Sequence, residues 1–149
     1  MAVTAFWFGP AQEGTYGATA ARRVDWVTDT IKVMLTTATY APDQDLHDFK
    51  DDVTNEITGT GYTAGGVTLG TKSVVYTTGT NTVSLRAADS VWASASFTAR
   101  RAVVYKDTGA AATSPVLGWV DFGADETVAA GTFTIDWDNT DGVLKIVVA

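Results

Sequence analysis

The chain has 149 residues, a length typical of one globular domain, and its 46% of hydrophobic and 18% of charged residues exclude a disordered chain. No apolar run approaches the roughly 18 residues of a membrane-spanning helix, and residues 1–20 lack the basic start of a secretory signal, so we expect neither. The net charge of −7 argues against a nucleic-acid partner, and the absence of cysteine excludes disulfides and thiolate chemistry.

Threonine and valine dominate the composition, with 25 Thr and 18 Val against only 6 Leu. Both are β-branched residues, which favour strands over helices, and 14 glycines are available for turns. The single histidine, His47, would have to serve any Ser/His/Asp triad and leaves no histidine-rich metal site. The composition therefore predicts an all-β protein and argues against an enzyme.

Residues 1–29 are predicted to form an N-terminal arm or extension that precedes a single β domain at 30–149. An aromatic triplet at positions 6–8 either belongs to a first strand or tucked arm, or it docks on a neighbouring subunit. Something must cover this triplet, because three exposed aromatic side chains in a row would promote aggregation. Residues 18–27 are predicted to form one short helix.

Hydrophobic and polar residues alternate with a period of two along most of the remaining chain, which is the pattern of half-buried strands. Strands are predicted at 31–36, 74–76, 83–85, 91–99, 102–105, 116–122, 132–138 and 143–148. Turn-forming residues at 78–80 and at Asp141-Gly142 separate neighbouring strands. The sequence thus predicts an antiparallel β-sandwich or jelly-roll-like barrel of about eight short strands.

The segment 43–56 carries six acidic residues and one basic residue, so a calcium site has to be considered. Counted from Asp43, however, the sixth position is not glycine and the twelfth is not glutamate, unlike in an EF-hand loop. The alternative is a short solvated helix near 46–52 with Asp45 as its N-cap. We prefer this alternative and predict no metal, and we interpret His47 as a surface ion partner rather than a base.

Two further patterns suggest chemistry only weakly. The glycine-rich segment 59–66 resembles a phosphate loop, but an extended stretch follows it and the nearest following lysine is Lys72, so we predict a crossing between strands. Asp136 and Asp138 could form a catalytic carboxylate pair. On one strand they point to the same face, and we interpret them as solvated positions. We therefore predict no catalytic residue and no cofactor.

The tryptophans are more informative. Trp137 shares a strand face with Phe133 and is predicted to lie in the core. Trp92 falls on the Ser/Thr face of its strand, and Trp119 lies opposite the valines of its own strand. A large aromatic ring on a polar face indicates an interface anchor or a sugar-stacking platform, unless a second layer or a loop buries the ring. The candidate interface residues are Phe6, Trp7, Phe8, Trp92 and Trp119.

Several segments together resemble small virion proteins of tailed bacteriophages. The resemblance is carried by TIKVMLTT at 30–37, YAPDQDLHDF at 40–49 and VTNEITGTGYTAGG at 53–66. It continues through AVVY at 102–105 and GWVDFG at 118–123. It covers roughly 30–148 and is most distinctive at 40–66, whereas the N-terminal segment lies outside it.

The resemblance implies a structural component of the phage particle without catalytic residues. The first expectation is a capsid decoration (cement) protein, made in the host cytoplasm and located on the outer surface of the capsid of the virion. Its implied partners are the assembled major capsid protein lattice and the chain itself, and a homotrimer would suit a threefold capsid position. A tail-associated or head-fibre protein is the alternative within the virion. A carbohydrate-binding β module, with Trp92 and Trp119 as platforms, is the competing class.

Overall fold

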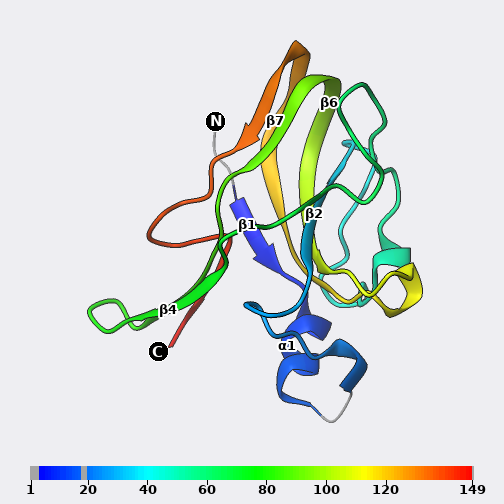
Figure 1. Cartoon of the computed structure of the whole chain (residues 1–149). Helices are drawn as coiled ribbons and strands as arrows, with labels where there is room; N and C mark the ends of the chain where they lie inside the picture. Colours follow the sequence, from blue (N-terminus) through cyan, green and yellow to red (C-terminus); the bar gives the residue numbers. More distant parts are fainter. Residues whose placement is uncertain (1–3, 18–19, 149) are drawn as a thin grey trace.

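The computed structural model describes residues 4–17 and 20–148, and antiparallel strands dominate it (Figure 1). Within these residues, one sheet has the strand order β1-β7-β6-β2-β3 and a second has the order β4-β5-β8. The predicted all-β sandwich is confirmed. The strands are β1 (Thr4–Trp7), β2 (Ile31–Thr36), β3 (Val67–Thr68), β4 (Ser73–Thr77), β5 (Thr82–Arg86), β6 (Ser90–Lys106), β7 (Val116–Ile135) and β8 (Leu144–Val147).

Strands β6 and β7 form a hairpin that is longer than the sequence predicts, because each joins two predicted strands into one. This hairpin folds over on itself at the top of Figure 1. Phe122 and Phe133 are eleven positions apart in β7, so a straight strand would separate them by about 36 Å. Their ring centroids are nevertheless 6.0 Å apart. The start of β6 and the end of β7 therefore fold back over the rest of the hairpin and form part of the second layer of the sandwich.

Local backbone irregularities allow this fold. Ser94 in β6 and Ala130 in β7 have positive φ angles of 51° and 47°, a backbone conformation that residues other than glycine rarely adopt. The pairing register between the two strands shifts on either side of Ala95. Such bulges bend a strand and reverse which face its next side chains occupy.

The five-stranded sheet buries apolar side chains on both faces. On one face of β2, Ile31, Val33 and Leu35 belong to the main core between the layers. On the other face, Met34 packs in a second cluster, which we call the N-terminal core. The fully or nearly buried members of the N-terminal core are Phe8, Ala11, Met34, Tyr40, Val103, Tyr105, Val116 and Trp119.

The N-terminal segment is part of this fold wherever it is described. Strand β1 pairs with β7, from Thr4 opposite Asp121 to Trp7 opposite Gly118. Trp26 is buried in the main core. Described residues on both sides of position 29 therefore pack together.

The helix predicted at 18–27 is wrong. Helix α1 spans Gly9–Tyr16 instead, and it begins at Gly9-Pro10, where the fixed φ of proline suits a first helical turn. Residues 18 and 19 lie outside the described residues, and a 3-10 turn, η1, follows at Ala20–Arg22. The carboxylate of Asp25 accepts hydrogen bonds from the N–H groups of residues 27 and 28, so this stretch forms a turn.

Candidate functional site

Three of the five candidate interface residues form an aromatic stack inside the chain. The ring of Trp119 lies 4.9 Å from that of Phe6 and 4.6 Å from that of Phe8, measured between centroids. Phe8 is fully buried and Trp119 is only 8% exposed, whereas Phe6 remains 37% exposed. The chain's own first strand therefore covers Trp119, and of the three stacked rings only that of Phe6 remains exposed.

The expectation that Trp92 lies on a polar face is wrong. Its side chain is 2% exposed and packs against Phe133, at 5.7 Å between ring centroids. The bulge at Ser94 places Trp92 on the same face as Ala95 and Phe97. A strand that alternated strictly would place Trp92 on the opposite face from these two residues. The predicted core position of Trp137 is confirmed, and its indole N–H donates a hydrogen bond to Ser90.

Trp7 has a different role from its neighbours in the triplet. Its indole N–H donates a 2.8 Å hydrogen bond to the main-chain oxygen of Lys145 in β8. This bond ties the first strand of the large sheet to the small sheet. Trp7 is partly buried against both the main core and the N-terminal core.

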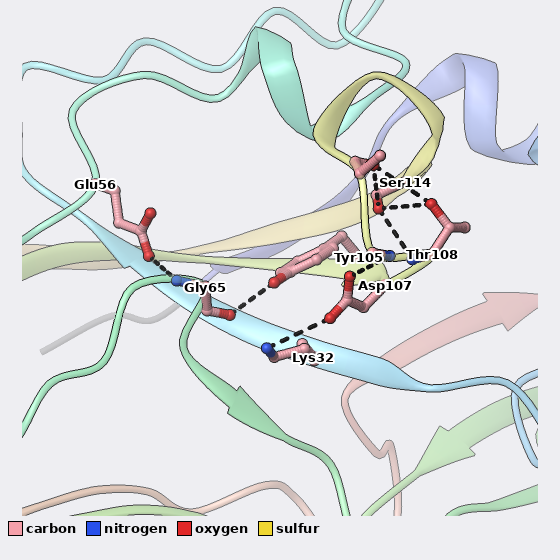
Figure 2. Close-up of polar contacts among 9 residues, drawn as sticks. Lys32, Glu56, Gly65, Tyr105, Asp107, Thr108 and Ser114 are labelled. Atoms are coloured by element: carbon pink, nitrogen blue, oxygen red, sulfur yellow. Dashed lines mark hydrogen bonds and ion pairs between the residues drawn. The ribbon is translucent and has the colours of Figure 1, made fainter.

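The glycine-rich segment 59–66 is a crossing held by side chains, as Figure 2 shows. The carboxylate of Glu56 accepts hydrogen bonds from the N–H of Gly65 at 2.5 Å and from the hydroxyl of Tyr62 at 2.7 Å. The hydroxyl of Tyr105 donates to the main-chain oxygen of Gly65 at 2.7 Å. The N–H of Gly65 is thus already bound by the Glu56 carboxylate and is not free to bind a phosphate, which argues against a phosphate loop.

The same region fixes the connection between β6 and β7 (Figure 2). Lys32 and Asp107 form an ion pair at 3.4 Å, and the hydroxyl of Ser114 accepts a hydrogen bond from the N–H of Thr108 at 3.0 Å. The N–H of Gly109 donates to the Asp107 carboxylate, and this bond is the main cause that lowers the pKa of Asp107. These contacts hold the connection between β6 and β7 against β2.

The acidic segment 43–56 uses its carboxylates to hold backbone. The carboxylate of Asp43 accepts from the N–H groups of Asp45 and Leu46, and it thereby closes a turn. The helix predicted near 46–52, with Asp45 as its cap, is therefore wrong, and a short 3-10 turn, η2, stands at Lys50–Asp52. This geometry is the Asx turn that aspartate favours over helix interiors.

Asp52 and His47 complete this local structure. Burial raises the pKa of Asp52, but hydrogen bonds from the N–H groups of Asp48 and Phe49 outweigh burial, so its pKa is lowered. His47 forms a 2.9 Å hydrogen bond with the hydroxyl of Tyr40, whose ring lies 5.7 Å from the imidazole. In the part of the chain that the structure describes, no three potential ligands are placed to hold a metal ion.

A groove of about 800 Å³ opens at the edge of the sandwich and is lined by residues from both halves of β7. Residues of strand β1 and of the segment 136–145 also line it. Its floor is apolar and includes Phe122, Phe133 and Leu144. Sequence reasoning missed this groove because it brings together residues far apart in the chain, and only the folded hairpin does so.

Carboxylates line the groove together with the apolar floor. Asp136 and Asp138, considered above as a catalytic pair, both lie here with Glu126 and Asp141. The side chain of Asp138 accepts hydrogen bonds from the N–H groups of Asp141 and Thr140, which lower its pKa. Lys145 is the one basic lining residue, and it pairs with Asp141. The lining thus has a net negative charge at neutral pH.

The three-stranded sheet is the second notable surface, and its outer half is uncovered. Tyr76 in β4 is 53% exposed and Val147 in β8 is 61% exposed, and by register they lie on opposite faces of the sheet. Val74 and Val148 are half exposed as well. The hairpin of β4 and β5 projects from the body of the molecule, at the lower left of Figure 1.

No protein-family model, curated protein or solved structure matches this chain. Among the described residues, no helix is long and apolar enough to cross a bilayer.

Proposed function

We propose that this chain is a structural component of a bacteriophage particle, and specifically a capsid decoration protein that binds the assembled major capsid protein. The sequence resemblance at 30–66 and beyond supports this proposal. In the fold, this stretch supplies β2 and the crossing that Glu56 and Tyr62 hold in place. The residues that carry the resemblance therefore include residues that build the large sheet, as a shared fold requires.

The observation that carries the proposal is the uncovered apolar surface of the small sheet. Tyr76 on one face of this three-stranded sheet and Val147 on the other leave apolar side chains in contact with water, and a partner that covered them would gain from their burial. Strand β4, with the uncharged sequence SVVYT, is moreover an edge without an outer partner among the described residues. A protein that assembles in many copies provides a partner for such a surface.

Assembly around a capsid symmetry axis would use this surface efficiently. Each copy bound to the shell raises the effective concentration of its neighbours, so several weak contacts give stable decoration. We propose a homotrimer whose copies meet through the β4-β5-β8 sheet. The large sheet, packed on both faces, provides the rigid body that holds these contacts.

The proposal is tested by adding the purified protein to expanded capsids that lack it. Because the protein would bind the lattice rather than free subunits, decorated shells should disrupt at a higher temperature than bare shells, with saturation at a fixed copy number. The variant Val74→Thr/Tyr76→Thr should bind less, whereas Tyr16→Thr, which removes an exposed ring from α1, should bind normally.

Two other results would redirect the assignment. Capsids that neither bind the protein nor gain stability, together with tails that bind it, would assign the protein to the tail. The carbohydrate-binding alternative has lost its two platforms, because Trp92 and Trp119 are buried. A decoration function therefore remains the proposal that the molecule supports best.

A further inference from the structure

We propose that the groove at the open edge of the sandwich binds an extended, arginine-containing segment of a partner protein. The volume of about 800 Å³ lies within the range of ligand sites, which is roughly 300–1,000 Å³. This proposal does not depend on the identity of the partner, so it holds or fails separately from the virion assignment.

The first argument is charge. Four carboxylates line the groove, and the one lysine in the lining is already paired with Asp141. The carboxylates of Glu126 and Asp136 form no hydrogen bond or ion pair in the part of the chain that the structure describes, so both remain available to a cationic ligand. A basic segment complements this lining, whereas an acidic or phosphorylated segment would be repelled.

The second argument is the apolar floor. Trp7, Phe122 and Phe133 contribute aromatic rings to the lining. A guanidinium group is planar and weakly hydrated, and it can stack on such rings while it pairs with a carboxylate. A segment that contains arginine and apolar residues could therefore contact both the aromatic rings and the carboxylates of the groove. A lysine ammonium is more strongly hydrated and stacks less well on aromatic rings.

The third argument is the origin of the cavity. The pairing register of β7 shifts between Asp121 and Glu126, around Gly123 with its φ of 82°, and both Phe122 and Glu126 line the groove. The fold of the hairpin brings the end of β7 back beside its first half, so Thr134 and Asp136 line the same groove. Strands β1 and β7 line the groove, and hydrogen bonds from the N–H groups of Thr140 and Asp141 to the carboxylate of Asp138 hold the turn beside it, so little ordering is needed before a ligand binds.

The test uses the full chain and a fluorescent heptapeptide of alternating arginine and leucine with blocked ends. Fluorescence anisotropy at low salt should show saturable binding that weakens as salt is added. A matched peptide with citrulline, the neutral isostere of arginine, should bind at least about fivefold more weakly, as expected when several exposed charge pairs are lost.

Variants locate the binding. Glu126→Gln/Asp136→Asn should weaken the arginine peptide by about fivefold or more. The control Asp45→Asn/Asp51→Asn changes the net charge equally at exposed positions outside the groove, and it should bind within about twofold of the unaltered chain. Thr134→Trp, at an exposed position in the lining, should block binding while thermal unfolding shows an intact fold.

Three outcomes would overturn the proposal. The first is no saturable binding of the arginine peptide, and the second is equal binding of the citrulline peptide. The third is an equal loss of binding in Glu126→Gln/Asp136→Asn and in the control Asp45→Asn/Asp51→Asn. This result would show an effect of net charge rather than of the groove. None of these results would depend on whether capsids bind the protein.

Discussion

The N-terminal core and the small sheet both contain aromatic residues and valines, but their apolar side chains are buried in the first and partly exposed in the second. In the N-terminal core, β1 and α1 fold back so that Phe8 and Trp119 are buried by the chain itself. In the small sheet, Tyr76 and Val147 stay exposed because no described segment packs over them. The difference shows that the most conspicuous aromatic residues of a sequence need not mark its interface.

This contrast has a physical basis. A large aromatic side chain gains most from burial, so the chain tends to satisfy it internally when a segment is within reach. Trp119 has such a segment, because β1 pairs directly alongside it, with Phe6 opposite. Strand β4 is an edge, and no described segment covers its exposed side chains Val74 and Tyr76.

Deletion of residues 1–16 should have the largest effect. It removes β1 and α1 and exposes Trp119, with a loss of about 5–10 kcal/mol from buried apolar surface alone, which is comparable with the stability of a whole domain. We expect the truncated chain to lose its cooperative thermal transition, measured by circular dichroism. A truncated chain that melts near the temperature of the full chain would show that the segment is a dispensable arm.

Trp119→Ala should have the next largest effect, at about 3–5 kcal/mol, because it opens a cavity between Phe6 and Phe8. For a chain of this length, the melting temperature should fall by about 10 °C or more. Urea titration would give the free energy of unfolding. A loss below about 1 kcal/mol would contradict the sealed N-terminal core.

Asp121→Asn should cost about 1–2 kcal/mol, because Asp121 pairs with Arg100 at 2.8 Å and Arg101 at 3.0 Å. Burial raises the pKa of Asp121, but hydrogen bonds from Arg100 and Gly123 outweigh it, so the pKa in the folded chain lies below the unfolded value. The stabilisation is therefore fully present above the unfolded value and is lost as the pH falls through the folded pKa.

Unfolding titrations at pH 7 and pH 3 would test this prediction. The difference in free energy of unfolding between the unaltered chain and Asp121→Asn should be smaller at pH 3 than at pH 7. A difference that stays constant would assign it to lost packing instead of lost charge pairing.

Val74→Thr/Tyr76→Thr should have the smallest effect on the stability of a single chain, within about 0.5 kcal/mol, because both side chains are half exposed. Its effect on association should be larger, and light scattering should show a shift from oligomer to monomer. If the unaltered chain is already monomeric at micromolar concentration, the small sheet does not join copies of the chain.

Several elements could be predicted from sequence because their signals are local. Strand β2 has the bounds that its alternation predicts, since Ile31, Val33 and Leu35 all pack on one face. The turn around Gly79 separates β4 from β5 as predicted. The turn at Asp141-Gly142 is also present, but it leads from the large sheet into β8 of the small sheet rather than joining two paired strands.

The sequence by itself determined the fold class, because β-branched residues at a period of two favour pleated strands wherever they lie. The tertiary structure alone decided which aromatic residues are buried and where the groove opens. The positive φ of Ser94 reverses the face of Trp92, and the fold of the hairpin brings Phe133 over Phe122. Both depend on a bend in the backbone that packing between distant segments stabilises, and no local alternation of residues records such a bend.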